Sequence, residues 1–464
     1  YPLDVSFTLR PAVTAILDGL RTAGFAAPGP HEVLTEIGEG VVQFAPPAIR
    51  PTPRVLLRLP RSLAWLIRGM RVTPEAWLAR CRSTLLPLIE RSDTTDVTTS
   101  TDDELLDAMA ELRRCQAELT PTRFTSAIPR VVLADAVLRR LLRLTLGRKA
   151  AVRAYADLHA TIPSITKESN QHLEQLAAMI RADEDLRRAY ADRPDAIVGR
   201  LQGFESGRRL LEEIDEYLRR FGCRQVVAPL IGFPPLRETP EVLHGMLANL
   251  AKSPPRVSDD SPDRSDDVMA RLTSGPGLRR GIFGPIAARL VDAVRAGVSM
   301  RENSHFWLFM AASAANRRYV LEIGRRLRER GVLDEPTDVL YLAWDELHAP
   351  VTENTRKLVQ RRRAAREAAE PGYTMFAPEH LGTRDADATV LRGVPASRGT
   401  AVGRVRIVRS EQDFGRLQPG EVLVCPYTNP AWTPLFSLAS AVVADVGGLS
   451  SHAAIVAREY GIPA

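Results

Sequence analysis

The spacing of apolar residues changes near residue 390 of this 464-residue chain, and that change limits the fold more than any other feature. Before it, apolar residues recur at the intervals of amphipathic helices, as in Leu9–Ala23 and Glu353–Glu370. After Leu391 the apolar runs are short and strand-like, and Pro and Gly turns separate them. We therefore predict a multidomain protein with a mostly α-helical domain at 1–375, a linker at 376–390 and a small α/β domain at 391–464.

The helical domain is predicted to be an array of helices that can enclose a pocket. A short strand at Val41–Phe44 interrupts the array, and residues 253–267 are so poor in apolar side chains that we expect a solvated loop or short linker. The predicted helices are Leu9–Ala23, Ser62–Met70, Pro74–Arg91 with a break at Pro87, Thr101–Thr120, Pro129–Leu146, Lys149–Ala160, Ser164–Ala182, Pro194–Gln202, Ser206–Phe221, Pro285–Ala296, Arg301–Arg330 and Glu353–Glu370.

The small domain is predicted to contain strands followed by a helix. The strands are Gly403–Arg409, Glu421–Cys425 and Ala441–Ala444, and the helix is Ala453–Tyr460. Gly461 and Pro463 end the helix.

The charge of the chain favours phosphate-containing ligands without indicating nucleic acid. The pI is about 9.3 and the net charge is +6, much of it from arginine, which binds phosphates well. However, basic stripes on long helices are usually solvated, and no RNA- or DNA-binding motif accompanies them. We therefore predict no nucleic-acid partner.

The cysteines and the apolar runs predict a cytoplasmic protein that has no membrane partner. The four cysteines are scattered and form no C-x-x-C pair, so we expect neither a disulfide framework nor a metal site. No apolar run approaches the roughly 18 residues that span a bilayer, and no signal peptide is recognisable. The chain starts with Tyr1 instead of Met and stops directly after Pro463-Ala464, so we expect a piece of a longer protein.

His452 is the strongest candidate for chemistry. It follows the glycine turn Gly447-Gly448, and Ser450 and Ser451 are good helix N-cap types, so it should lie in a first helical turn. Free backbone N–H groups and the helix dipole favour an anion there, and a neutral imidazole is a nucleophile. The pattern is typical of a histidine that carries a phosphoryl group. The alternative is a capping or half-buried histidine after a glycine turn.

The sequence around His452, G-G-L-S-S-H-A-A-I-V-A-R-E-Y-G-I-P-A, resembles a family signature. It is the phosphohistidine signature of the mobile domain shared by phosphoenolpyruvate synthase, pyruvate phosphate dikinase and rifampin phosphotransferase. Two earlier segments, Gly393–Gly399 and Thr428–Phe436, resemble other parts of that domain. The Thr428 and Thr433 hydroxyls could bond the phosphohistidine, or they could simply belong to a capped helix.

Segments of the helical domain resemble the acceptor-binding part of rifampin phosphotransferases. They are Tyr217–Arg224, Pro235–Pro240 and the region from Met300 to Leu347, and they occur in the family's order. In one respect the chain departs from relatives: Val226–Pro229 stands where they have an acidic residue. A rifamycin is therefore only one possible acceptor.

The resemblance implies a dikinase-type phosphotransferase. A swivelling phosphohistidine domain would carry a phosphoryl group from ATP to a hydroxyl of a bulky apolar acceptor. No Walker loop or other glycine-rich nucleotide cradle is recognisable, so ATP and Mg²⁺ are expected on an ATP-grasp domain or subunit outside this chain. Relatives continue past the position of Ala464, and the small domain is accordingly expected to be C-terminally incomplete.

Several residues are candidates for roles on either side of the transfer. Gly447, Gly448, Ser450, Ser451, Thr428 and Thr433 would surround the phosphoryl group on His452. Arg301 and Glu302, expected at the start of a long helix, could serve as phosphate clamp and base, and His305 is a second candidate base. The alternatives are helix capping, exposure to solvent, or simple packing. At the level of the whole chain, the alternatives are a non-catalytic helical binding or scaffold module, or a related enzyme that phosphorylates a small alcohol, phenol or biosynthetic intermediate.

Overall fold

The computed structural model of the chain shows two compact units. It describes residues 1–22, 25–38, 41–44, 50–51, 73–123, 128–160, 162–191, 197–225, 230–252, 278–350, 352–369, 390–391, 393–409, 411–428, 432–445 and 451–464. The first unit combines Tyr1–Leu133, Leu230–Gly232 and Trp307–Thr389, and the second combines Ala134–Pro229, Phe233–Phe306 and Val390–Ala464. The C-terminal α/β part therefore belongs to the same unit as the helices between residues 134 and 306.

The first unit is built around helix α15 (Ala312–Glu329). It packs against α5 (Pro74–Thr94), α6 (Asp102–Thr122) and the 3₁₀ turn η5 (Pro336–Tyr341). Gly324 permits a close approach of η5, because a Cβ atom at this position would lie 2.0 Å from the carbonyl oxygen of Pro336. A full-sized side chain at Gly324 is therefore excluded by the backbone of η5.

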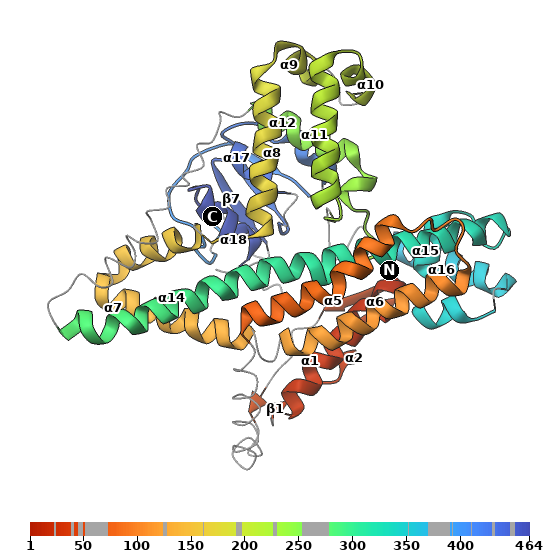
Figure 1. The fold of residues 1–464 in the computed structure, drawn as a ribbon, viewed down its shortest axis with the longest axis horizontal. Coiled ribbons are helices and arrows are strands. Elements are labelled where there is room, and N and C mark those ends of the chain that lie inside the picture. Colours follow the sequence, from red (N-terminus) through yellow and green to blue (C-terminus); the bar gives the residue numbers. More distant parts are fainter. Residues whose placement is uncertain are drawn as a thin grey trace. The chain divides into compact units, whose positions relative to one another are not determined.

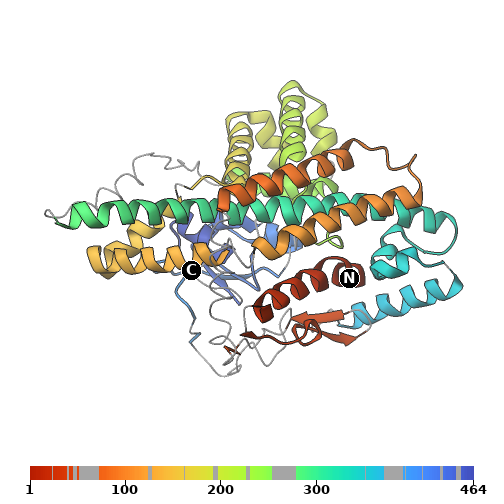
Figure 2. The same cartoon turned by 60° about the horizontal axis from the view of Figure 1, so that its bottom comes forward.

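Smaller elements complete this unit. They are η1 (Asp4–Leu9), α1 (Arg10–Thr22), β1 (Phe25–Ala26), α2 (Pro30–Val33), β2 (Leu34–Gly38), β3 (Val41–Phe44), β4 (Arg50–Pro51), η6 (Trp344–His348) and α16 (Glu353–Ala369). Strands β2 and β3 form an antiparallel hairpin, and Figure 2 shows the cyan helix α16 beside it.

The helices of the second unit include two long ones, α7 (Ile128–Ala160) and α14 (Leu278–Ser304). Gly147 interrupts α7 with φ 78° and ψ 163°, a conformation that glycine adopts without steric cost. Leu142, Ala154 and Leu158 of α7 pack in one buried cluster with Val291 and Val294 of α14. A π-helical segment, η4 (His305–Ala311), follows α14, and its residues from Trp307 onward belong to the first unit.

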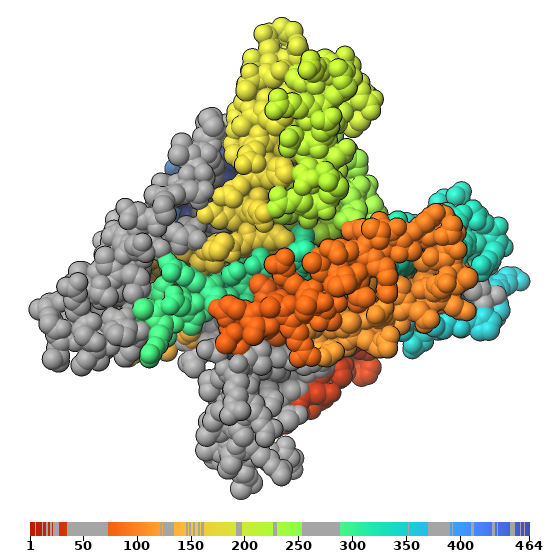
Figure 3. Space-filling view, in the orientation of Figure 1, coloured from red at the N-terminus to blue at the C-terminus, as the bar shows by residue number. Residues whose placement is uncertain are grey.

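A group of shorter helices forms the rest of the helical part of this unit. They are α8 (Ile165–Ala182), α9 (Glu184–Ala191), α10 (Ile197–Gln202), α11 (Glu205–Phe221), the 3₁₀ turn η3 (Leu236–Glu238) and α12 (Pro240–Lys252). Helices α8 and α11 pack side by side (Figure 1), and their yellow and green surfaces meet in Figure 3. The apolar stripe of α11, Leu210, Ile214, Tyr217 and Phe221, has helical spacing and is fully buried.

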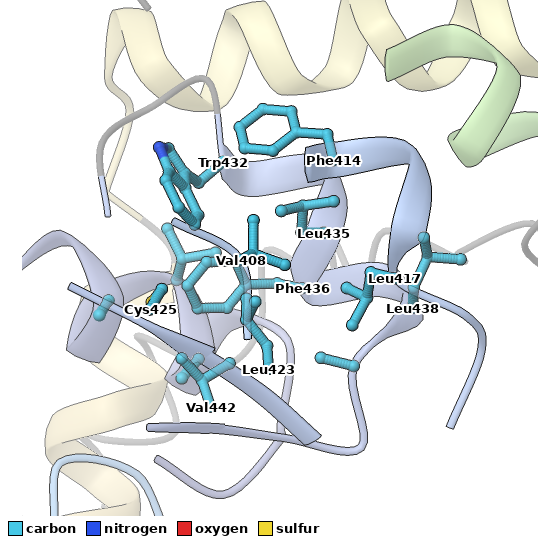
Figure 4. Close-up of a cluster of buried hydrophobic side chains, with 14 residues drawn as sticks. Val408, Phe414, Leu417, Leu423, Cys425, Trp432, Leu435, Phe436, Leu438 and Val442 are labelled. Atoms are coloured by element: carbon cyan, nitrogen blue, oxygen red, sulfur yellow. The ribbon is translucent and has the colours of Figure 1, made fainter. Parts of the chain in front are cut away.

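The C-terminal part is a parallel three-stranded sheet in the order β5 (Val405–Ile407), β6 (Val422–Cys425), β7 (Ala441–Ala444). The connections carry η9 (Glu411–Arg416) and α17 (Thr433–Leu438), and α18 (His452–Glu459) follows β7. Phe436 lies at the centre of the hydrophobic core of this α/β part, surrounded by Val408, Leu423 and Cys425 (Figure 4). Both η9 and α17 pack against α12, which joins this α/β part to the helices of its unit.

The sequence predicted most of these elements. The mostly helical composition and the three-stranded C-terminal sheet are confirmed, as is the interruption of α7 at Gly147. The break at Pro87 is wrong, because α5 continues through this residue. Pro87 is exposed, while Leu85 and Leu88 beside it are buried, so tertiary packing outweighs the lost backbone hydrogen bond.

The predicted start of a helix at Arg301 is also wrong. Helix α14 runs through the predicted gap after Ala296, so Arg301 and Glu302 lie in its last turn. The predicted helix Ser62–Met70 and the polar loop at 253–267 lie outside the described residues, as does almost all of the predicted linker at 376–390.

Candidate functional site

His452 is the first residue of α18, at the carboxyl end of the sheet. The side chain of Ser451 caps the helix, since its Oγ accepts a hydrogen bond from the Ala454 N–H at 3.3 Å. The predicted N-cap and the place of His452 in the first turn are therefore confirmed. The predicted phosphate-binding role of Ser451 stays a prediction, and three other candidates for that role, Gly447, Gly448 and Ser450, lie outside the described residues.

Two threonine hydroxyls approach the two ring nitrogens of His452. Thr428 Oγ1 lies 2.9 Å from Nδ1, and Thr433 Oγ1 lies 3.5 Å from Nε2. Thr428 follows β6 and His452 follows the neighbouring strand β7, and the carboxyl ends of parallel strands share one edge of a sheet. The ring of Phe436 meets the imidazole edge-on, with centroids 6.3 Å apart. The ring is thus held in one orientation.

The surroundings of His452 keep its imidazole neutral. Desolvation by the packed protein lowers its pKa first, and the positive charges of Arg224 and His305 lower the pKa further, to about 3. Some of the side chain stays accessible, because His452 is only half-buried. At neutral pH the ring therefore offers an unprotonated nitrogen lone pair.

Arg224 and His305 belong to the helical part of the same unit. His305 is the first residue of η4, and Arg224 follows α11. Their charges act on His452, so this helical region contributes to the electrostatic surroundings of the ring. The structure thus brings one predicted acceptor-side residue, His305, into the electrostatic neighbourhood of His452.

Arg301 and Glu302 form a half-buried ion pair next to this region. The Arg301 Nη2 atom lies 3.2 Å from Glu302 Oε1, and Glu302 Oε2 lies 3.5 Å from the hydroxyl of Thr166 on α8. The backbone N–H of Ile165 donates to the side chain of Asn303, which ties the start of α8 to the end of α14. Both predicted residues therefore lie where α8 and α14 meet.

Arg224 is almost completely buried and is held by hydroxyl groups. It is 4% exposed, and it donates to Ser169 Oγ at 2.6 Å and to Thr166 Oγ1 at 3.0 Å. Ser169 also bonds the buried Tyr217 hydroxyl at 3.0 Å. We call Arg224, Thr166, Ser169 and Tyr217 the hydroxyl cradle. Through Thr166, the cradle contacts Glu302.

Comparisons with known proteins agree with this geometry. Residues 123–302 match the model of the rifampicin phosphotransferase fourth domain, and residues 417–464 match the mobile domain of PEP-utilising enzymes. The chain belongs to the PEP-utilising phosphotransferases and is rifampicin phosphotransferase-like. The first match contains Arg301, Glu302 and the hydroxyl cradle, and the second contains Thr428, Thr433 and His452.

Individual relatives cover most of the chain at low identity. A rifampicin phosphotransferase of Streptomyces sviceus is 30% identical over 410 residues, which are 81% of this chain and 46% of the relative. The uncharacterized phosphotransferase YvkC of Bacillus subtilis is 25% identical over 408 residues, 82% of this chain and 48% of the relative. A rifampicin phosphotransferase of the same Bacillus strain is 28% identical over 347 residues, 69% of this chain and 38% of the relative. The chain spans about half or less of the length of these relatives.

Sequence reasoning did not find the hydroxyl cradle of this family member. Arg224 ends a segment that resembles the family, but a buried arginine cannot be told from an exposed one in so arginine-rich a chain. For Thr166 and Ser169, the sequence indicated only that they lie near the start of a helix after Ser164. The spacing of Tyr217 within the apolar stripe of α11 indicated burial without indicating a polar partner.

The described residues contain no cluster of His, Cys, Asp and Glu side chains that could hold a metal ion. Among the helices of the described ranges, none is both long and apolar enough to cross a membrane. The groups assembled at the candidate site are an imidazole, hydroxyl groups, guanidinium groups and a carboxylate.

Proposed function

We propose that this chain transfers a phosphoryl group from ATP, on an ATP-grasp domain or subunit, through His452 to a hydroxyl of a bulky apolar acceptor. The observation that carries the proposal is the unprotonated His452 ring at a helix start, with a hydroxyl at each nitrogen. The family matches on both parts of the site support it.

The two hydroxyl contacts indicate which ring nitrogen reacts. Thr428 holds Nδ1 at 2.9 Å, whereas Thr433 stands 3.5 Å from Nε2, at the limit of a hydrogen bond. We assign the Nδ1 proton to the bond with Thr428, so that the lone pair of Nε2 attacks the β-phosphorus of ATP. The bond from this phosphorus to the α-phosphate oxygen breaks and AMP leaves with that oxygen, while water hydrolyses the γ-phosphoryl group to inorganic phosphate. Thr433 then lies beside the phosphorylated nitrogen and can donate to a phosphoryl oxygen.

Transfer to the acceptor breaks the N–P bond and forms a P–O bond. The bonding electron pair returns to Nε2, and the acceptor's hydroxyl proton passes to a base on the acceptor side, for which Glu302 and His305 are the candidates. Glu302 Oε1 is engaged by Arg301, which leaves Oε2 toward Thr166. The contribution of the protein to such a transfer is mainly placement and charge stabilisation.

The acceptor is proposed to be bulky and apolar because the chain is rifampicin phosphotransferase-like over residues 123–302. Several relatives are named rifampicin phosphotransferases, which makes a rifamycin the first acceptor to test. Small alcohols, phenols and biosynthetic intermediates form the second group.

The test supplies an ATP-grasp partner and ATP labelled at the β-phosphoryl group. The wild-type chain should acquire a label that is labile in acid and stable in alkali, and His452→Ala should acquire none. Equal labelling of His452→Ala, or no labelling of the wild type with an active partner, would leave a non-catalytic binding module as the better description. Saturable binding of a rifamycin to the chain would then separate the antibiotic from other acceptors.

A further inference from the structure

Arg224 is a buried cation for which the described residues provide no carboxylate partner. It is 4% exposed, and its partners are neutral hydroxyls, among them those of Ser169 and Thr166 at 2.6 and 3.0 Å. Its Nε atom is also buried and has no hydrogen-bond partner within the described part of the chain. The guanidinium group therefore retains both an uncompensated charge and a free donor.

Such an arrangement is unfavourable unless an anion completes it. A buried charge is normally paired, because removing it from water costs free energy that only an opposite charge offsets. Arg326 in the first unit illustrates the usual solution, since it bonds both Asp102 and Glu322. Arg224 lacks this compensation, and a guanidinium with free N–H groups is well suited to a phosphate.

The surroundings of Arg224 indicate that its anion is the phosphoryl group carried by His452. Its charge acts on His452, the proposed phosphoryl carrier, and its partner Thr166 contacts Glu302, a candidate base of the acceptor side. Arg224 therefore acts electrostatically on the carrier and is linked through Thr166 to an acceptor-side carboxylate, and all these residues belong to one compact unit. A phosphoryl group leaving Nε2 of His452 would bring its negative oxygens into this region.

We propose that Arg224, held by Thr166, Ser169 and Tyr217, binds the non-bridging oxygens of the phosphoryl group as it passes from His452 to the acceptor. This inference rests on the proposed function. During the step the N–P electron pair returns to Nε2, the acceptor oxygen bonds to phosphorus, and the hydroxyl proton goes to Glu302 or His305. Arg224 exchanges no proton and stabilises the negative charge throughout, as a preorganised donor does.

The hydroxyl cradle explains how the cation is kept ready. Thr166 and Ser169 lie near the start of α8, three positions apart, so their side chains are on the same face of the helix. Both hydroxyls therefore face Arg224. Their bonds fix the two terminal nitrogens of Arg224 without neutralising its charge. Neutral hydroxyls orient the guanidinium, whereas a carboxylate would compete with the phosphoryl group.

The first experiment measures binding of inorganic phosphate to the full chain, because phosphate presents the same oxygens. Arg224→Gln should weaken binding on the order of ten- to a hundredfold, the loss expected for charge-assisted hydrogen bonds. Arg220→Gln is the matched control: Arg220 lies four positions earlier, is exposed and pairs with Glu168, so its loss should leave the affinity unchanged. Arg224→Lys retains the charge, and its affinity should lie between those of wild type and Arg224→Gln.

Circular dichroism must show that the variants are folded. If Arg224→Gln does not fold, the phosphate affinity of Arg224→Lys is compared with that of the wild type instead. Equal phosphate affinity in wild type and in the folded Arg224 variants, or no phosphate binding by the wild type, would overturn the proposal. Nuclear magnetic resonance gives a second readout: the pKa of His452 should rise in Arg224→Gln, since a positive neighbour is lost. An unchanged pKa would also contradict the assignment.

Labelling at His452 separates this inference from the proposed function. With the ATP-grasp partner and β-labelled ATP, Arg224→Gln should still acquire the label, because the residue acts on the acceptor side. If the wild type acquires no label, the proposed function is contradicted. The phosphate-binding measurement would still decide whether Arg224 binds phosphate. Loss of labelling in Arg224→Gln alone would contradict the acceptor-side role.

Discussion

At the residue scale, we propose that the hydroxyl of Thr428 sets the tautomer of the His452 ring. It lies 2.9 Å from Nδ1, and when it accepts the Nδ1 proton, as assigned above, the lone pair is on Nε2. Thr428→Val has nearly the same shape but cannot form this bond, and one lost hydrogen bond is worth about 1 kcal/mol. We therefore expect the rate of phosphoryl labelling to fall about five- to tenfold in Thr428→Val. Thr428→Ser should label at nearly the wild-type rate, and comparable losses in both variants would argue that the methyl group is what matters.

The depressed pKa of His452 also predicts a pH dependence of stability. The His452 ring binds a proton only near pH 3 in the folded chain, whereas in the unfolded chain it binds one near its ordinary pKa of 6.5. Between these values the unfolded state holds more protons, so stability is lost as the pH falls from 6.5. His452→Gln cannot titrate, and it should lose less thermal stability than the wild type between pH 7 and pH 5. His172 and His244 have lowered pKa values as well, but both variants share them, so their contribution cancels.

At the element scale, a single glycine controls how closely α15 and η5 pack. A Cβ atom at Gly324 would lie 2.0 Å from the Pro336 carbonyl oxygen, and backbone cannot move aside as a flexible side chain can. We expect Gly324→Ala to lower the free energy of unfolding by about 1–3 kcal/mol, as overpacking does. Gly245 in α12 is the control, because no atom lies within 4 Å of an added Cβ. Gly245→Ala should stabilise the chain by about 0.5–1 kcal/mol through helix propensity. Chemical denaturation of both variants checks the pair, and equal effects would contradict the packing argument.

The same scale shows why the sequence predicted elements better than the site. Apolar periodicity and capping residues are local, so α8, α11 and β7 were found within one residue of their bounds. The break expected at Pro87 failed because the buried residues beside it keep α5 in register. Thr428 and Thr433 were found through a resemblance. Arg224 was not, because its burial depends on α8, which lies far away in the sequence.

At the scale of the whole molecule, the α/β part packs against α12 through η9 and α17 in this structure. This arrangement directs His452 toward Arg224 and His305, which is the acceptor side of the proposed reaction. To receive a phosphoryl group from ATP on a different domain or subunit, His452 must become accessible to that donor. We therefore expect the α/β part to leave α12 during each cycle.

That requirement can be measured by amide hydrogen exchange. On addition of the ATP-grasp partner and ATP, exchange should increase in α12 (Pro240–Lys252) and α17 (Thr433–Leu438), because each loses the surface that covers it. Helix α6 belongs to the first unit and serves as the internal reference, with an exchange rate that should stay unchanged. Phosphate at His452 would be attracted by Arg224, so the phosphorylated chain with ATP removed should recover the protection of α12. If α12 stays equally protected while His452 is being labelled, the α/β part receives its phosphoryl group in place, and the donor must reach His452 without this movement.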